Sequence, residues 1–214
     1  VHRLTILPAY DDQAALSPDN RSLAFVSSRE DGSTDIYIMD LENRQVRNLT
    51  SSPGGDFRPS WSPDGQTLAF SSDRGTGFPH QGYPEPAGRW EHVQAANVYL
   101  IESDGTGLRQ LTTDPNMMVG SPKWSADGKR LVFYELPVLD TFRAHYAGPA
   151  SSIVSIDLET GERTVHAAGP GLKVLPHFIA PQHIAYYSRT RDSGTLNFTN
   201  AKASEPRDLS NPSW

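Results

Sequence analysis

Histidine, arginine and aromatic side chains gather in two segments of this 214-residue chain, "GTGFPHQGYPEPAGRWEHVQ" at 75–94 and "LPVLDTFRAHYAGPA" at 136–150. Exposed aromatic and arginine side chains carry most of the binding energy at protein interfaces. We therefore predict that the two segments bind a partner or ligand. The alternative is that they only pack themselves against the rest of the protein, as long loops often do. The candidate binding residues are His80, Tyr83, Trp90, His92, Phe142, Arg143 and His145.

The same histidines are the residue type that most often binds a transition metal, and Glu91 could complete a ligand set with them. Metal-binding histidines on one strand or helix are usually recognisable by a His-x-His or His-Glu-x-x-His spacing, and neither spacing occurs in the sequence. We therefore expect ordinary surface histidines, no metal site and no cofactor.

Two common kinds of nucleophile are missing from the sequence. The chain has no cysteine, which excludes disulfides, thiolate zinc sites and cysteine catalysis. It also has no Gly-x-Ser-x-Gly elbow, so a serine hydrolase centre of that type would have to lie in another domain. We nominate no catalytic residue, and we expect the chain itself to be a binding module rather than an enzyme.

Charge and hydropathy restrict the partners. The formal net charge is −6 and no basic cluster is present, which argues against nucleic acid as a partner. No apolar run is long enough to cross a bilayer, so contact with a membrane would be indirect, through partners. The lack of cysteine fits a periplasmic or exported protein, although many cytosolic proteins lack cysteine too.

A repeated phrase indicates the fold. "LSPDNRSLAFVSSR" at 16–29, "WSPDGQTLAFSSDR" at 61–74 and "WSADGKRLVFYE" at 124–135 each set a turn between two apolar runs. A Pro-x-Trp or similar element opens the units at Pro59, Pro122 and Pro176. Asp-Gly or Asp-Asn ends a tight turn because Gly and Asn accept a left-handed backbone, so the turn joins two antiparallel strands.

Two further strands complete each unit. The third is seen in "DIYIMDLE" at 35–42, where apolar and polar residues alternate with the period of a strand. The fourth is short and ends in Leu-Thr or Leu-Ser, as at Leu49-Thr50 and Leu111-Thr112. Four strands in a unit of about 40 to 45 residues are typical of a β-propeller. The predicted fold is all-β, with four-stranded antiparallel blades.

The Pro-x-Trp, Ser-Pro-Asp-Gly, Leu-Ala-Phe and Ser-Asp-Arg elements together resemble the TolB-like propeller repeat, a WD40-like repeat. This resemblance implies a periplasmic bacterial protein that docks a partner on one propeller face. Similar repeats occur in the propellers of prolyl-oligopeptidase-type and amidohydrolase-type hydrolases. They also occur in polysaccharide lyases that use His, Tyr and Arg near the central channel, where His177 is the residue of interest.

The ends of the chain carry parts of further units. Leu4-Thr5 resembles the end of a fourth strand and Trp214 the first strand of another unit. We expect an arc of a ring of about six to eight blades, with partial strands at both ends. The expected blades span about 10–50, 55–112, 118–168 and 172–210.

Spacing within the repeat locates the insertions. The interval from Phe25 to Tyr37 is 12 residues, whereas Phe70 to Tyr99 is 29, so the second blade carries an insertion at about 75–96. The third carries another at about 135–150. Both connect second and third strands, so we expect them side by side on the face that also holds the connections between blades. Those connections, at 50–57 and 112–120, would bring Asp56, Asn116 and Met117 to the same surface. This face is predicted to bind a protein, a peptide or a carbohydrate.

Overall fold

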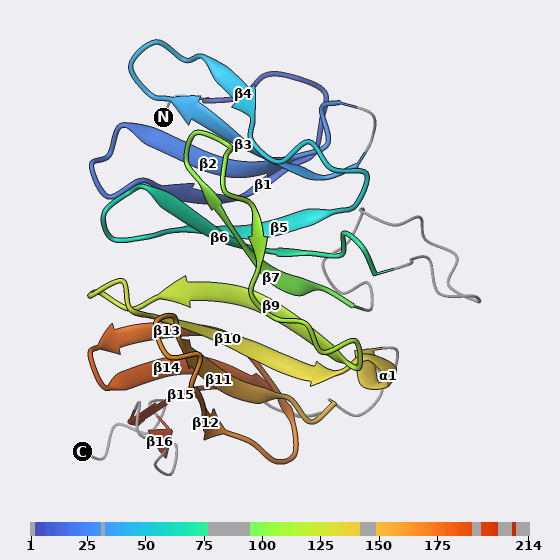
Figure 1. Cartoon of the computed structure of the whole chain (residues 1–214), viewed down its shortest axis with the longest axis vertical. Helices are drawn as coiled ribbons and strands as arrows, with labels where there is room; N and C mark the ends of the chain where they lie inside the picture. Colours follow the sequence, from blue (N-terminus) through green and yellow to red (C-terminus); the bar gives the residue numbers. More distant parts are fainter. Residues whose placement is uncertain are drawn as a thin grey trace.

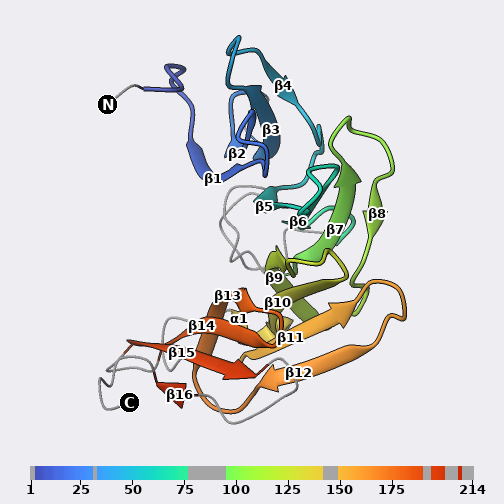
Figure 2. The ribbon, with the colours of Figure 1, turned by 90° about the vertical axis from the view of Figure 1, so that its left-hand side faces the viewer.

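The computed structural model describes residues 3–30, 33–76, 95–141, 149–189, 194–200 and 207–208. Its strands form four antiparallel sheets, each made of four strands hydrogen-bonded in chain order. Figures 1 and 2 show the four sheets following one another along the chain as blades. The prediction of an all-β propeller with sequential four-stranded blades is confirmed. Within the described residues, no helix is long and apolar enough to cross a membrane.

Each blade runs from a first strand to a fourth strand in the same order. The first blade consists of β1 (Asp11–Leu16), β2 (Ser22–Ser27), β3 (Asp35–Asp40) and β4 (Val46–Asn48). The second consists of β5 (Asp56–Trp61), β6 (Thr67–Ser72), β7 (Asn97–Glu102) and β8 (Arg109–Gln110). The third consists of β9 (Met117–Trp124), β10 (Arg130–Pro137), β11 (Ser152–Asp157) and β12 (Arg163–Ala167), with the short helix α1 (Val138–Thr141) after β10. The fourth consists of β13 (Leu172–Ala180), β14 (His183–Arg189), β15 (Gly194–Asn200) and β16 (Arg207–Asp208).

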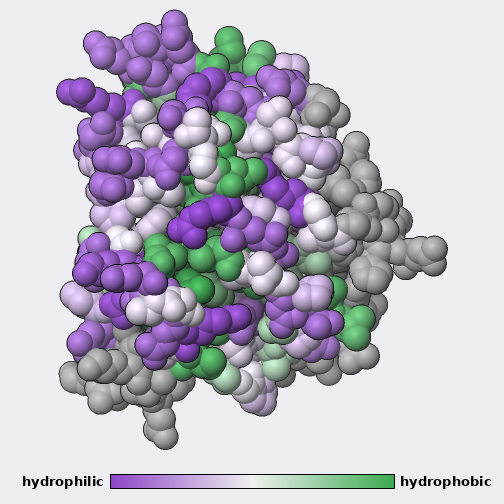
Figure 3. Space-filling view, in the orientation of Figure 1, coloured by the Kyte–Doolittle hydropathy of each residue, from purple (hydrophilic) through white to green (hydrophobic). Residues whose placement is uncertain are grey.

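The hydrophobic cores lie between blades. Leu68 and Phe70 of the second blade pack with Val26 and Ile36 of the first. Similar clusters join the second blade to the third and the third to the fourth. The first strands are innermost, since β5 contacts β1 and β9, and β9 contacts β13. Over the face shown in Figure 3, hydrophilic residues predominate and hydrophobic ones emerge in small areas between them.

The aromatic residue that ends each first strand links neighbouring blades. The Trp61 indole N–H donates to the Ala15 carbonyl at 3.0 Å, and the Trp124 indole N–H donates to the Ser60 carbonyl at 3.0 Å. Phe178 holds the same position in the fourth blade and packs on the core beneath it, without an N–H to donate. All three side chains are partly buried at the blade interfaces, and none is fully enclosed.

The first strands also share a backbone irregularity that the repeat pattern did not predict. Gln13, Arg58, Ser121 and Leu175 each stand three positions before the terminal aromatic or its equivalent, and their φ angles lie between 53° and 55°. In every blade the strand register shifts at this point, as in a β-bulge. A left-handed backbone at a non-glycine residue is costly, so its recurrence in four blades identifies it as part of the fold.

The Ser-x-Asp-Gly turns form as predicted. The Ser62 hydroxyl donates to Asp64 Oδ1 at 2.5 Å, and the same oxygen accepts the Gln66 N–H at 3.0 Å. These hydrogen bonds, led by that of Ser62, lower the pKa of Asp64 below its ordinary value. Gly65 follows with a φ of +72°, and Gly128 of the third blade has a φ of +70°. Successive turns also touch, because a Cβ at Gly65 would lie 3.6 Å from Pro18 Cδ of the preceding blade.

The turn geometry predicts a large effect for one substitution and a small effect for another at the same repeat position. Gly65→Val places a β-branched residue at a positive φ, and we expect the free energy of unfolding to fall by about 1 kcal/mol or more. Asn20 holds the equivalent position with a φ of +60°. Asn20→Gly relieves the same restriction and is expected to change stability by only a few tenths of a kcal/mol. Urea denaturation of both variants measures this, and equal losses of stability would contradict it.

Candidate functional site

The two ends of the blades form different faces. One, here called the turn face, carries the first-to-second-strand turns at 17–21, 62–66 and 125–129. The other, here called the loop face, carries the second-to-third-strand connections and the links between blades. Figure 1 shows the turns on the left and α1 on the right. The strands that flank both predicted insertions, β6 with β7 and β10 with β11, have those ends on the loop face.

Seven of the eight candidate residues lie outside the described residues, namely His80, Tyr83, Trp90, His92, Phe142, Arg143 and His145. The start of the second insertion is described. The Val138 N–H of α1 donates to the Asn116 carbonyl at 2.8 Å. This hydrogen bond ties the insertion to the connection between the second and third blades. Asn116 itself is exposed and Met117 is partly buried.

Asp56, the eighth candidate, is fully buried. Its Oδ2 accepts a hydrogen bond from Arg74 Nη2 at 2.6 Å, and this ion pair joins the start of β5 to the residues that follow β6. The Arg74 guanidinium also lies over the Phe70 and Tyr99 rings, 5.2 and 5.3 Å from their centroids. The Tyr99 hydroxyl donates to the Arg74 carbonyl at 3.1 Å. Asp56 thus anchors the base of the first insertion.

Burial and charge act in opposite directions on this carboxyl group. Removal from water raises the pKa of Asp56, while the Arg74 guanidinium favours its charged form. A buried carboxylate of this kind depends on its partner, because an unpaired charge in the interior is strongly unfavourable. The pair therefore holds the start of β5 and the segment after β6 in one relative position.

The same arrangement occurs in the first blade. Arg29 Nη2 donates to Asp11 Oδ1 at 3.1 Å and its guanidinium lies over the rings of Phe25 and Tyr37. The repeated position of Arg29, Arg74 and Arg189 suggested a structural arginine that pairs with the next strand or blade. For Arg29 and Arg74 the partner instead comes from the first strand of the same blade.

The third and fourth blades replace this arrangement. In the third, Arg163 of β12 pairs with Glu135 of β10 and lies over the Phe133 ring. In the fourth, Lys173 takes the position of Asp56 and is buried. Its Nζ donates to the carbonyls of Gly169 at 2.8 Å and Pro170 at 3.1 Å, and burial lowers its pKa. Only the two blades with an aspartate at this position thus use the Asp–Arg pair.

The Leu-Thr pairs that close the first two blades have a specific role on the same face. The Thr50 hydroxyl accepts the Ile36 N–H at 3.0 Å, and the Thr112 hydroxyl accepts the Val98 N–H at 2.9 Å. Each threonine therefore satisfies the donor of the third strand just where the fourth strand leaves the sheet. The hydrogen bond therefore fixes the position from which the chain leaves each blade towards the next one.

Two basic side chains lie on neighbouring inner strands. Lys123 of β9 and His177 of β13 each precede the terminal aromatic residue of their strand. Burial lowers the pKa of His177, and the positive charge of Lys123 lowers it further. His177 is consequently neutral at physiological pH.

Other combinations of reactive residues are enclosed or scattered. Ser155 Oγ and His166 Nε2 are 2.7 Å apart, but both residues are only 3% exposed, so a substrate cannot reach the pair. Within the described part of the chain, no three His, Cys, Asp or Glu side chains are grouped as metal ligands would be.

Comparison with known proteins agrees with this architecture. Residues 5–83 match the family model of the TolB beta propeller domain. The matched segment, which covers the first blade and the start of the second, is similar to TolB propellers, and the whole chain has the fold of a β-propeller. TolB from Acinetobacter baumannii is 23% identical and superposes with a TM-score of 0.68 over 95% of this chain and 46% of that protein. The chain thus spans about half of that relative's length. No curated protein sequence matches the chain.

Enzymes share the fold as well. Oligogalacturonate lyase from Vibrio parahaemolyticus is 18% identical, with a TM-score of 0.69 over 96% of this chain and 54% of the lyase. A prolyl endopeptidase structure is 12% identical, with a TM-score of 0.62 over 94% of this chain and 28% of that enzyme. At these identities the likeness establishes the fold alone.

The anchoring role of Asp56 predicts a large effect of Asp56→Asn on stability. The substitution removes one charge of a buried pair and leaves Arg74 without its counterion, so we expect a loss of about 3 kcal/mol in the free energy of unfolding. Asp11→Asn is the matched change in the first blade. The two arginines are similarly accessible, at 10% for Arg29 and 14% for Arg74, but Asp11 is 15% exposed whereas Asp56 is fully buried, so water can solvate the substituted side chain only in the first blade.

Guanidinium chloride denaturation compares the two variants with the parent protein. Asp11→Asn should be clearly the milder substitution. An Asp56→Asn protein as stable as the parent would show that the buried pair does not hold the two segments together.

Proposed function

We propose that this TolB-like propeller is a binding scaffold that docks a protein partner on its loop face. A peptide or carbohydrate ligand is the other chemistry that the candidate residues suit. The resemblance to TolB supports a periplasmic or exported location. On this proposal, His80, Tyr83, Trp90, His92, Phe142, Arg143 and His145 form the rim of the site, and Asp56 supports it from beneath.

One observation carries the proposal: the structure fixes the bases of both insertions on the same face. The first insertion leaves β6 at the Asp56–Arg74 pair. The second leaves β10 through α1, which is hydrogen-bonded to Asn116 in the adjacent link between blades. Long loops held at rigid bases are the usual way in which a repeat scaffold presents a binding surface.

A second candidate function is a polysaccharide lyase, and Lys123 with His177 is the observation that favours it. A neutral histidine next to a lysine on the inner strands has the character of a base beside a cation that could bind an acidic sugar. The lyase relative is named for oligogalacturonate. Incubation with oligogalacturonate, followed by ultraviolet absorbance of an unsaturated product, tests this function directly. A third candidate function is that of the propeller domain of a larger hydrolase. The sequence of the whole gene product tests it, because a hydrolase domain would have to be encoded in the same gene.

Site-specific photo-crosslinking in the native cell tests the scaffold proposal. We expect a photoreactive residue at Asn116, which is exposed on the loop face, to give a covalent adduct with the partner. Lys129, exposed on the turn face, is the matched position and should give none. The double substitution Trp90→Ala and Arg143→Ala should abolish the Asn116 adduct while the melting temperature stays unchanged, because rim hot spots contribute to binding rather than to folding.

Two results would contradict the proposal. An adduct from Lys129 without one from Asn116 would place the partner on the turn face. A lower melting temperature of the double variant with an undiminished adduct would show that the two insertions only pack against the blades.

A further inference from the structure

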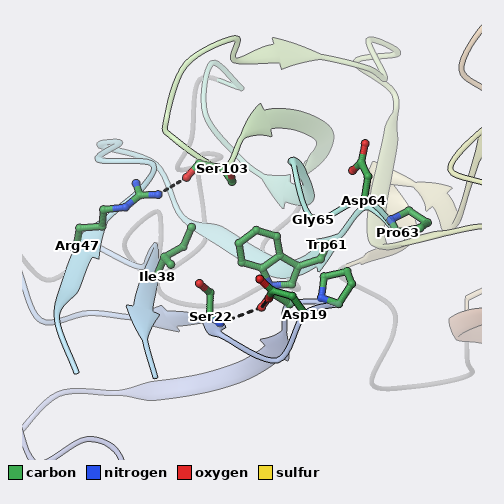
Figure 4. Close-up of a pocket in the computed structure, with 11 residues that line it drawn as sticks. Asp19, Ser22, Ile38, Arg47, Trp61, Pro63, Asp64, Gly65 and Ser103 are labelled. Carbon is green, nitrogen blue, oxygen red and sulfur yellow. Dashed lines mark hydrogen bonds between the residues drawn. The ribbon is translucent and has the colours of Figure 1, made fainter. Parts of the chain in front are cut away.

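A pocket of about 440 Å³ opens on the turn face, between the first and second blades. It is remote from the loop face, so an inference about it stands or falls independently of the proposed scaffold function. In the view of Figure 4 the Trp61 indole occupies the middle of the pocket, with Ile38 and Arg47 to its left and Pro63 and Asp64 to its right. Asp19 and Ser22 of the first blade and Ser103 of the second line it as well.

The repeat explains why a pocket exists at this junction. Leu41, Ser103 and Leu158 are equivalent, because each donates its N–H to the second residue after the turn aspartate of its own blade. Leu158 of the third blade packs against the cluster that contains Leu100 and Trp124, which fills the junction between the second and third blades. Ser103 occupies that place at the first junction, and its small side chain leaves the space in front of Trp61 open.

The next junction is filled by a different side chain. Arg130 is equivalent to Ser22, because the N–H of each donates to the serine hydroxyl that opens its turn. The Arg130 guanidinium extends over the Phe178 ring, 5.1 Å from the ring centroid. It also donates to the Pro181 carbonyl at 2.5 Å. The pocket therefore combines two small residues: Ser103 stands where the second junction has Leu158, and Ser22 stands where the third junction has Arg130.

Negatively charged side chains outnumber positively charged ones around the pocket. Asp19 and Asp64, from turns of adjacent blades, each use Oδ1 to accept a serine hydroxyl and a backbone N–H. These hydrogen bonds, of which the serine bond is the strongest cause, lower the pKa of both carboxyls, so both are ionised at neutral pH. Arg47 is the one basic residue of the lining, and its guanidinium donates to the Ser103 carbonyl. The lining carries a net charge of −1, from two carboxylates and one guanidinium.

The remaining lining is apolar. The Trp61 ring, the Ile38 side chain and the prolines of both turns, Pro18 and Pro63, surround the space next to the carboxylates. An aromatic face attracts a cation through its π electrons, and proline and isoleucine accommodate an aliphatic stem. The pocket thus places an aromatic face and an aliphatic surface side by side, with two carboxylates at its edge.

We propose that this pocket binds an organic cation, an ammonium or guanidinium group carried on a short aliphatic stem. The stem lies against Trp61 and Ile38, and the cationic group pairs with the carboxylate of Asp19, which lies beside Trp61 in Figure 4. The volume of about 440 Å³ accommodates one such group, which can be a free small amine or an arginine or lysine side chain of a peptide.

Titration with butylguanidinium, followed by ¹H–¹⁵N NMR, tests the site. We expect saturable shifts of the Trp61 indole N–H and of the Gly65 and Ser103 amides. The neutral isostere butylurea should give none, since it lacks the charge that the Asp19 carboxylate recognises. A blocked Gly-Arg-Gly peptide distinguishes the sources: binding at least as tight as that of butylguanidinium indicates a peptide side chain, and binding of the free cation alone indicates a small amine.

Three variants make the test specific. Asp19→Asn keeps the Oδ1 acceptor of the turn but removes the charge, and should weaken binding about fivefold. Asp127→Asn is the matched change in the third blade, outside the pocket lining, and should leave binding unchanged. Ser103→Leu copies the residue present at Leu158 and should abolish binding while the protein stays folded.

The proposal is overturned if butylguanidinium and butylurea shift the same amides equally, or if neither does. It is also overturned if Ser103→Leu, shown to be folded by its NMR spectrum, binds as the parent protein does. Equal weakening by Asp19→Asn and Asp127→Asn would assign the effect to overall charge rather than to this pocket.

Discussion

The contact between successive first strands is the constraint on which the rest of this propeller depends. The three largest hydrophobic clusters each combine side chains of two neighbouring blades, whereas the small cluster of Phe25, Tyr37 and Met39 lies within the first blade. Trp61 and Trp124 hold this contact in register by donating to a carbonyl of the preceding first strand. The β-bulge at Gln13, Arg58, Ser121 and Leu175 recurs three positions earlier, so each inner strand enters the junction with the same bend.

The two ends of a blade are stabilised by different chemistry, and this difference leaves them suited to different tasks. At the turn face, short hydrogen bonds such as Ser62 to Asp64 close each turn locally. At the loop face, the Asp56–Arg74 pair, the aromatic rings beneath it and the closing threonines fix points from which the chain can leave the sheet. Long insertions are tolerated there because the sheet is already satisfied before they begin.

Departures from the repeat are as informative as the repeat itself. Ser103 in place of the leucine found at Leu158 opens a pocket at one junction without changing the backbone hydrogen bond made there. Lys173 in place of an aspartate changes an ion pair into a set of carbonyl contacts. Lys123 and His177 bring two basic groups to neighbouring inner strands where Ala15 and Ser60 are small. A repeat scaffold acquires local chemistry in this way, one position at a time, while its blades keep the same architecture.

The sequence alone determined the blade architecture, because the turn signals and the alternation of apolar residues are local and recur in register. It therefore predicted the strand order and the left-handed backbone of Gly65 and Gly128 in the turns. It also located the insertions, because their lengths interrupt a known spacing.

Only the tertiary structure decided which residues meet. Asp56 was expected at a binding surface by its position in the chain, and the fold buries it against Arg74, 18 residues away. The pocket at Trp61 likewise combines residues of two blades, from Asp19 to Ser103, and it is open because Ser22 and Ser103 are small. Burial, pairing and cavities are properties of contacts distant in sequence, which a local pattern does not encode.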